Sequence, residues 1–275
     1  MRSSETACRE CPGKQSWYNL PKKVILLAKY ILLDTETTGA GEGDRIIQLG
    51  YMVLAPGEAV EVHNDFCSSE VPIGFGAMEV HNITPEMIEG KPPCTETAAY
   101  RRLLELNTPD NYLIIHNAPF DIGMLEKEGF ASRMQMIDTL RCARHIFADE
   151  EAHRLQYFRY RLGLYRQEAE EAASLGIEIK AHDAIGDVLT LKLFLSELRK
   201  AVQEQFPGVN PVEKMVELTT LPIFVRTFRF GKYKGRDLAD VALEDPGYLR
   251  WMLTGMESLD EDLRYSINRV LGNGE

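Results

Sequence analysis

The chain has 275 residues, of which 44% are hydrophobic and 27% are charged, a composition typical of a soluble globular protein. Its best candidate for a membrane span, residues 24–33, falls short of the ~18 apolar residues required and is interrupted by Lys29. The formal net charge of −11 disfavours sequence-independent coating of nucleic acid, which needs many cations to neutralise phosphates. Five scattered cysteines argue against a disulfide framework, so we expect a cytoplasmic protein that is not bound to a membrane.

Strand signals dominate the first part of the chain. Residues 1–24 show no clear period, so we expect them to form an N-terminal tail. Apolar runs of strand length then alternate with short polar turns, which predicts an antiparallel meander. The expected strands of this meander cover residues 31–39, 45–55 and 59–68, and a further short, buried strand is expected at residues 111–117.

Helix signals alternate with the later strand. They occur at four places: residues 95–106, a start at Pro119, residues 139–155 with Asp138 and Thr139 as capping residues, and residues 181–206. The last of these helices is long and amphipathic, and we expect it to start near Asp183. Together the patterns predict an α/β domain over residues 25–206, in which helices pack on a mixed sheet.

The C-terminal part of the chain differs in composition. Residues 207–220 open with a Pro-Gly pair and hold a short helical pattern, so we expect a linker there, followed by a compact module over residues 221–275. Cations and aromatic rings interleave without an acid in one stretch of this module: Arg226, Phe228, Arg229, Phe230, Lys232, Tyr233, Lys234 and Arg236. Such a stripe suits single-stranded nucleic acid, because cations bind phosphates and rings stack on bases. The alternative is a β-hairpin whose rings pack inward while its cations stay in solvent.

Two acids lie at the end of the first expected strand. Asp34 and Glu36 are two residues apart, so the strand period points both side chains to one face. Paired carboxylates suit Mg²⁺ or Mn²⁺, which prefer oxygen ligands. Chance alone predicts about 1.4 such pairs in this chain, and a second copy at Asp149 and Glu151 follows no buried strand, so we interpret it as a solvated loop.

Two more acids stand at the starts of expected helices. These are Asp121 and Asp187, each with a histidine five residues earlier, namely His116 and His182. Either pair alone could be a helix-dipole partner next to a hydrogen-bonded histidine. Together with the pair on the strand, however, four carboxylates would converge only to hold metal, because unpaired like charges repel strongly.

The three segments LLDTETTG, HNAPFD and HDAIGD resemble, in this order, the motifs of the DEDDh group of DnaQ-like 3′ to 5′ exonucleases. The resemblance implies an RNase H-like fold in which four acids hold two Mg²⁺ or Mn²⁺ ions and a histidine acts as general base. Carried over, the acids are Asp34, Glu36, Asp121 and Asp187, and the base is His182. The HNIT segment is similar to one that lies near the bound strand end in the family, which implies contact with substrate for His81.

The likeness extends beyond the motifs to roughly residues 27–272, because residues 227–253 are similar to the C-terminal segment of the exodeoxyribonuclease X branch, which degrades DNA. We expect the metal ions to activate a water and brace the scissile phosphate. His182 is the expected base, and His116 is its rival, since spacing alone does not separate them. Further substrate contacts are expected from Thr37, Asn117, Phe120, Arg229, Lys232 and Lys234. For the first three, a strand end, a helix cap and a core position are the alternatives.

The leading functional hypothesis is hydrolysis of DNA from its 3′ ends, single-stranded or duplex, in repair or recombination. An RNA-trimming exonuclease would use the same chemistry, and contacts to the 2′-OH would decide between the two substrates. Two further hypotheses belong to another functional class: a proofreading subunit docked on a polymerase, and an inactive protein that only binds nucleic-acid ends. A complete set of four acids and a histidine argues against the inactive protein, and the chain's own basic module argues against obligatory docking on a polymerase.

Overall fold

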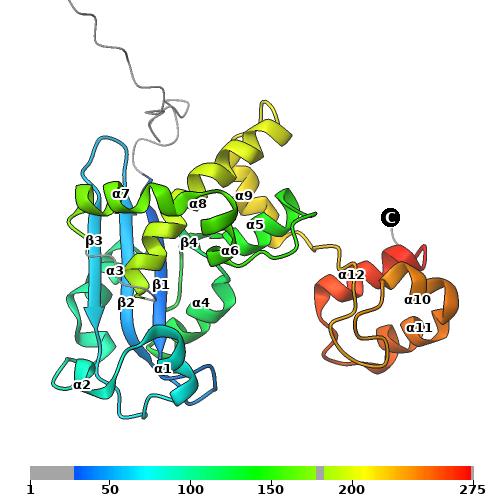
Figure 1. Ribbon diagram of the computed structural model, residues 1–275, viewed down its shortest axis with the longest axis horizontal. Helices are drawn as coiled ribbons and strands as arrows, with labels where there is room; N and C mark the ends of the chain where they lie inside the picture. The colour runs from blue at the N-terminus through cyan, green and yellow to red at the C-terminus, as the bar shows by residue number, and fades with distance from the viewer. Residues whose placement is uncertain (1–27, 178–182, 274–275) are drawn as a thin grey trace, which may run out of the picture.

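A five-stranded mixed sheet forms the centre of the larger part of the molecule (Figure 1). The computed structural model describes residues 28–177 and 183–273, so the expected tail at residues 1–24 and His182 lie outside the described residues. The strand order is β3-β2-β1-β4-β5. Strands β1 (Tyr30–Thr37), β2 (Ile46–Leu54) and β3 (Glu61–Phe66) pair antiparallel, which confirms the predicted meander.

Two short strands extend the sheet on the other side of β1. Strand β4 (Tyr112–Ile115), expected from the sequence, pairs parallel with β1, and β5 (Gln135–Asp138) pairs parallel with β4. The sequence patterns did not predict β5, because four residues give too little alternation to distinguish a strand from a loop. Asp138, expected at a helix start, ends β5 and accepts hydrogen bonds from the backbone N–H groups of Leu140 and Arg141.

Helices cover both faces of the sheet. One face, which includes Leu32, packs against α5 (Thr139–Ile146), α6 (Leu155–Arg161), α7 (Glu168–Leu175), α8 (Ala184–Gln205) and α9 (Pro211–Thr220). The opposite face, which includes Leu33, packs against α3 (Ala98–Leu106) and α4 (Ala118–Lys127), while α1 (Phe75–His81) and α2 (Pro85–Ile88) cover a smaller apolar cluster around Ile47. Short 3₁₀ turns occur at Cys94–Glu96 and Leu164–Arg166. Because successive residues of a strand face opposite ways, β1 contributes to both layers.

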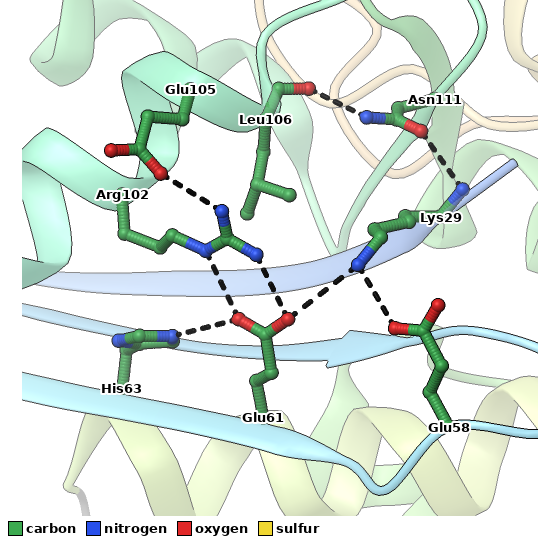
Figure 2. A network of polar contacts seen from close by, with 8 residues as sticks. All are labelled: Lys29, Glu58, Glu61, His63, Arg102, Glu105, Leu106 and Asn111. Carbon is green, nitrogen blue, oxygen red and sulfur yellow. Dashed lines mark hydrogen bonds and ion pairs between the residues drawn. The ribbon is translucent and has the colours of Figure 1, made fainter. Parts of the chain in front are cut away.

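Polar contacts attach the edge strand β3 to its neighbours (Figure 2). Arg102 of α3 donates from Nε and Nη2 to the two carboxylate oxygens of Glu61, at 3.1 and 2.9 Å. Lys29 lies 3.6 Å from the same carboxylate and 3.0 Å from that of Glu58, and its backbone N–H donates to Asn111. A bidentate charged contact of this kind fixes orientation as well as distance. The network therefore holds β3, α3 and the start of β1 in register.

The structure corrects two boundaries that the sequence suggested. The helix expected over residues 139–155 ends at Ile146, because His153 donates from Nε2 to the carbonyl of Phe147 and the chain turns there before α6. The segment 207–220, expected to be a linker, contains α9, whose Val212, Met215 and Leu218 belong to the core of the larger domain. Amphipathic spacing in a short segment cannot show which surface will cover it.

The C-terminal module has a core of its own, built from α10 (Leu238–Glu244), α11 (Pro246–Gly255) and α12 (Glu261–Val270). In Figure 1 these helices lie to the side of α5 and α9. Arg141 of α5 donates two hydrogen bonds of 3.0 Å to Asp262 of α12, which also accepts the N–H of Ile223. Within the described residues no helix is long and apolar enough to cross a membrane.

Candidate active site

Three carboxylates converge at the end of β1. Asp34 and Glu36 share a face of β1, as the strand period predicts, and this is the face on which α8 packs. The first turn of α8 brings in Asp187. One side-chain oxygen from each of these residues lies within 4.8 Å of the others, and all three side chains are half-buried. The structure thus brings together residues that are 151 positions apart in the sequence.

The fourth predicted acid, Asp121, lies next to this group. It comes from the first turn of α4 and is 3% exposed. Its Oδ1 accepts hydrogen bonds from the backbone N–H and the hydroxyl of Thr35, at 2.9 and 2.7 Å. Since the ladder between β1 and β4 ends at Leu32, this carboxylate satisfies an N–H beyond the last pair of that ladder. Asp121 is therefore held at the same strand end, with one oxygen committed to Thr35.

Close packing of α8 on β2 positions Asp187. Gly50 lies opposite Asp34 in the sheet, and a Cβ at Gly50 would come within 2.8 Å of the Cβ of Ala184. The side chain of Gln48 accepts the N–H of Ala184 at 3.3 Å and donates to Asp183, the residue that precedes the helix. Glycine at this position is therefore what lets the helix start approach the strand.

Gln156 of α6 contacts the carboxylates from another side, because its Nε2 donates to Oδ1 of Asp187 at 2.7 Å. Sequence reasoning missed Gln156 and Gln48. Their roles depend on tertiary packing, and neither glutamine stands in a pattern that would have indicated it. Asp183 was expected only as a helix start, yet its charge also raises the pKa values of Asp34 and Glu36.

Burial and mutual repulsion perturb the acids strongly. Burial raises the pKa of Asp34 well above its usual value, and the charges of Asp121 and Asp187 raise it further. Burial and the charge of Asp187 raise the pKa of Glu36 to about 8. The pKa of Asp121 rises to about 7 through burial, against the lowering effect of its hydrogen bonds from Thr35. Carboxylates that oppose one another in this way are stabilised by a cation between them.

The donor set fits a hard divalent cation. All the converging ligand atoms are carboxylate oxygens, with no sulfur or imidazole nitrogen among them in the described residues. Such a set suits Mg²⁺ or Mn²⁺, which bind few protein carboxylates and retain positions for water and phosphate oxygens. The cluster can therefore hold a metal ion, which would relieve the repulsion among its carboxylates.

The described histidines have structural partners. Nε2 of His116 donates to the carbonyl of His153 at 2.9 Å, and its Nδ1 lies 3.0 Å from the hydroxyl of Thr139. Burial lowers the pKa of His116 to about 4. Both ring nitrogens of His116 are thus occupied, so this histidine is poorly placed to act as a base. A hydrogen-bonded histidine of this kind is the alternative interpretation that the sequence leaves open. His182, the expected base, lies outside the described residues.

His81 is buried under the end of β1. Its Nε2 donates to the carbonyl of Thr37 at 3.1 Å, and its Nδ1 accepts the N–H of Ile83 at 2.9 Å. Thr37 is itself buried, and its hydroxyl donates to the carbonyl of Gly39. Both residues therefore shape the backbone beside the carboxylates.

Asn117 and Phe120 lie at the start of α4, near Asp121. Asn117 is exposed and adopts a left-handed conformation with φ of 80°, and its backbone N–H donates to Asp138 at 3.1 Å. Phe120 is half-buried and packs against the core on the α3 and α4 face. Its ring therefore contributes to the core, which is the alternative role expected for Phe120.

The basic and aromatic stripe of the C-terminal module is divided by the fold. Phe228 and Tyr233 pack into the module's core, whereas Phe230 is 44% exposed. Lys232 pairs with Asp245 at 3.0 Å, while the exposed Arg229 and Lys234 have no ion-pair partner in the part of the chain that the structure describes. The segment doubles back as a minimal hairpin, in which an antiparallel bridge joins Thr227 to Asp237 and the N–H groups of Phe228 and Leu238 donate to the carbonyls of Arg236 and Arg226. The rings of Phe228 and Tyr233 therefore pack inward, as the alternative interpretation predicts, whereas the ring of Phe230 does not.

Comparison with known proteins gives two family matches. The exonuclease family model (RNase T) matches residues 31–194, more than half of the chain, and the exodeoxyribonuclease X-like C-terminal model matches residues 228–254. Exodeoxyribonuclease 10 of Escherichia coli K12 is 26% identical over 247 residues, which cover 88% of this chain and 98% of that protein. A PolC-type DNA polymerase III of Clostridium perfringens is 27% identical over 231 residues, which cover 74% of this chain and 16% of the polymerase.

Among solved structures, exonuclease X in complex with 5′ overhanging duplex DNA is similar with a TM-score of 0.48 and 18% identity, and the match covers 70% of this chain and 99% of that one. The family match confirms the expected RNase H-like fold, in which helices flank a mixed five-stranded sheet. The family that the motifs indicated is confirmed as well. The chain therefore belongs to the DnaQ-like family of 3′ to 5′ exonucleases, and it is a hydrolase of phosphodiester bonds.

Proposed function

We propose that this exonuclease removes nucleotides from the 3′ ends of DNA, with two divalent ions bound by Asp34, Glu36, Asp121 and Asp187. The convergence of Asp34, Glu36 and Asp187 within 4.8 Å is the observation that carries the proposal. The choice of DNA is supported by the likeness to an exodeoxyribonuclease along 88% of the chain. The choice of Mg²⁺ or Mn²⁺ follows from the oxygen-only donor set.

The protein's own groups would divide the work as follows. Asp34 and Glu36 would supply ligands from a rigid strand, while Gln156 would orient Asp187 through the hydrogen bond to its Oδ1. Asp121, held by Thr35, would keep one carboxylate oxygen for a ligand. When bound, the ions would supply a water activated for attack and a counter-charge for the phosphate.

His182 would take the proton of the attacking water. The support for this role is the HDAIGD motif, in which His182 precedes Asp187 by five residues, together with the occupied ring nitrogens of its rival His116. A general base of this kind contributes about 10² to 10⁴ in rate. Replacement of His182 should therefore cost less activity than loss of a metal ligand.

The terminal nucleotide would lie against the surface around the end of β1. We propose that Thr37 and Asn117 orient its phosphate and sugar, and that Phe120 contacts its base. The role of His81 would be indirect, since its hydrogen bond fixes the Thr37 carbonyl. In the C-terminal module the phosphates would be bound by three cations, Arg229, Lys232 and Lys234. Lys232 would first have to break its ion pair with Asp245.

The biological setting that fits best is DNA repair or recombination in the cytoplasm. Cys67, Cys94 and Cys142 are buried, unpaired thiols, which suits a reducing compartment. Trimming of RNA ends by the same chemistry is the second candidate. A proofreading role beside a polymerase is the third, and the similarity to PolC-type polymerases favours it. We place it below a free-standing enzyme because the chain carries its own C-terminal module.

The test is degradation of matched 3′-labelled and 5′-labelled DNA and RNA oligomers with Mg²⁺, Mn²⁺ or EDTA. Wild type should release mononucleotides from DNA 3′ ends only with metal, and Asp34→Ala and His182→Ala should lose most of this activity. Asp110→Ala, which removes an exposed acid outside the carboxylate cluster, is the matched control and should remain active. Faster degradation of RNA would move the substrate to RNA, and release that persists in EDTA would overturn the metal mechanism.

A further inference from the structure

A groove separates the larger domain from the C-terminal module. Its volume is about 600 Å³. One wall comes from the end of α5 and residues 148–153 of the following loop, and the other from residues 223–230 of the segment that enters the module. The bonds from Asp262 to Arg141 and to the N–H of Ile223 hold the two walls at a fixed spacing. The groove is therefore a fixed feature of the interface between the larger domain and the C-terminal module.

Two arginines in this groove lack a partner. Arg144 of α5 is half-buried and Arg229 is exposed, and neither has a hydrogen-bonded acid or carbonyl among residues 28–177 and 183–273. Burial lowers the pKa of Arg144, and the nearby charge of Arg229 lowers it further, while Asp262 and Asp138 partly oppose this shift. Two unpaired guanidinium groups that repel each other across a groove favour an anion between them. Arg226, a third cation in the lining, pairs with Asp149 on the outside at 3.0 Å.

The acids that line the groove are mostly committed elsewhere. Asp262 pairs with Arg141, and Glu150 accepts from the hydroxyl of Tyr157 and pairs with Arg161. Asp260 accepts the N–H of Leu263 at the start of α12. Glu151 is the remaining acid in the lining, and it is exposed. The unpaired charge inside the groove is thus mainly positive, although the whole chain carries −11.

Two aromatic rings complete the lining. Phe230 is 44% exposed, Phe224 is 38% exposed with the Arg269 guanidinium 5.8 Å from its ring centroid, and the neighbouring Phe228 is buried in the module's core. Exposed rings next to unpaired arginines are the combination that binds single-stranded nucleic acid, because each base stacks on a ring while its phosphate meets a cation. A peptide with acidic residues would satisfy the arginines but would leave the flat rings without a stacking partner.

The groove connects to the carboxylates through one short segment. His153 lines the groove, and its carbonyl accepts the hydrogen bond from His116 at the end of β4. Three residues further along, Gln156 donates to Asp187 in the carboxylate cluster. The segment that lines the groove at His153 thus also contacts a proposed metal ligand through Gln156.

We propose that this groove binds the unpaired DNA strand upstream of the 3′ end, with phosphates between Arg144 and Arg229 and bases on Phe224 and Phe230. The inference rests on the proposed function for the identity of the strand. It assigns a binding role to Arg144, Phe224 and Phe230, and it places Arg229 within the interface rather than on an outer face of the module.

The test is binding of a fluorescent 15-nucleotide single strand to the full chain in EDTA, so that no hydrolysis intervenes. The double variant Arg144→Gln/Arg229→Gln should bind about tenfold or more weakly, and the slope of log K against log salt should fall by about 1.4, at ~0.7 per lost phosphate contact. Arg250→Gln, an exposed arginine of the same module outside the groove, is the matched control and should bind as wild type does.

Phe230→Ala tests the stacking contact separately. Removal of this exposed ring should have little effect on folding. It should weaken binding by an amount within the ~1 to 3 kcal/mol found per stacked base, and it should leave the salt slope unchanged. Unchanged affinity and slope in the double variant would overturn the proposal. So would tighter binding of a poly-glutamate peptide than of DNA, lost in the same variants. Because binding is measured without catalysis, a wild type that binds DNA but fails to degrade it would overturn the proposed function alone.

Discussion

At the scale of single residues, the carboxylate cluster that can bind metal lowers the stability of the metal-free protein. Burial and the surrounding acids raise the pKa of Asp34, so in the metal-free protein this carboxyl either repels its neighbours or takes up a proton, and both cost stability. We predict that Asp34→Asn raises the unfolding temperature in EDTA, by about 2 to 4 °C for each kcal/mol of repulsion removed. The same variant should lose activity by about a thousandfold or more, since metal ions contribute several kcal/mol to such reactions.

Differential scanning fluorimetry with EDTA and with Mn²⁺ separates the two effects. Wild type should gain stability from Mn²⁺, and Asp34→Asn should gain little, because a ligand is missing. Asp110→Asn serves as the control, since this exposed acid lies outside the cluster and should leave both midpoints near those of wild type. A lower midpoint for Asp34→Asn in EDTA would show that Asp34 has a favourable partner in the metal-free protein.

The raised pKa values also predict how metal binding depends on pH. Glu36 and Asp121, with pKa values of about 8 and about 7 in the metal-free protein, must release protons before they can bind a cation. An acid whose pKa is raised in the folded state costs stability as pH rises above its unfolded value. Between about pH 6 and about pH 8, the metal-free midpoint should therefore fall while Mn²⁺ affinity rises.

Calorimetric titration of Mn²⁺ in buffers of different ionisation enthalpy measures the protons released on binding. At about pH 7 the count should exceed zero and should decrease as pH rises beyond about 8. A pH-independent affinity with no proton release would contradict the raised pKa values.

Residue spacing predicted part of this site for a clear reason. The two-residue period of a strand puts Asp34 and Glu36 on one face whatever the rest of the fold, and the pattern survives in the structure. The hydrogen bonds of Gln48 and Gln156 instead join residues 135 and 31 positions apart. Neither contact follows from local geometry, so only the assembled fold reveals them.

At the scale of elements, the contact between β2 and α8 controls the position of Asp187. A methyl group at Gly50 would lie 2.8 Å from the Cβ of Ala184 and 2.9 Å from the backbone N of Ile185, so the helix start would have to move. We predict that Gly50→Ala destabilises the fold by about 1 to 3 kcal/mol, the usual cost of overpacking. Activity should fall more steeply, because small displacements of a ligand cost about a hundredfold.

Gly43→Ala is the matched control for this variant, since nothing lies within 4 Å of a Cβ at that position. Denaturant unfolding and the rate of nucleotide release should both remain near wild type in the control. If Gly50→Ala kept full activity, α8 could shift without moving Asp187, and the close contact would serve packing alone.

The Glu61 network predicts an acid-dependent contact between β3 and α3. Hydrogen bonds from Arg102 lower the pKa of Glu61 from 4.5 to about 2. Its contribution is therefore complete above about pH 4.5 and is lost as pH falls towards about 2. Because this side chain is 32% exposed, we expect Glu61→Gln to cost only about 1 kcal/mol near neutral pH.

Urea unfolding at about pH 7 and about pH 3 measures this difference, which should shrink at the lower pH. Glu105→Gln is the control. Glu105 also meets Arg102, at 2.8 Å, but its side chain is 66% exposed, so its removal should change stability little. Equal losses for the two variants would mean that the bidentate geometry adds nothing to the charge.

Strong periodicity determined which elements could be predicted. The long helix α8 and the first three strands gave clear patterns, whereas β5 and the break between α5 and α6 did not. The break depends on the bond from His153 to the Phe147 carbonyl, and α9 depends on a surface that only the folded domain presents. Amphipathic spacing thus predicted that α9 is a helix but not which domain it joins.

At the scale of the whole molecule, the position of the C-terminal module depends on few contacts. The module has its own core, so it can keep its fold while its attachment changes. Asp262 is central to the attachment, because it binds both Nη atoms of Arg141 and the N–H of Ile223. Its side chain is 12% exposed, and that of Arg141 is 25% exposed, so the pair is partly shielded from water.

We predict that Asp262→Asn loosens this attachment and leaves the carboxylate cluster intact. An amide cannot accept from both Nη atoms and the N–H, so the interface should lose about 1 to 3 kcal/mol. Limited proteolysis should then cleave faster within residues 221–227, and binding of the 15-nucleotide strand in EDTA should weaken because the groove walls separate. Lys232→Gln, which removes an exposed pair within the module, is the control for proteolysis and should leave the cleavage rate unchanged. If Asp262→Asn accelerated cleavage but bound the strand as tightly as wild type, the module would bind DNA by itself, and the groove would not need both walls.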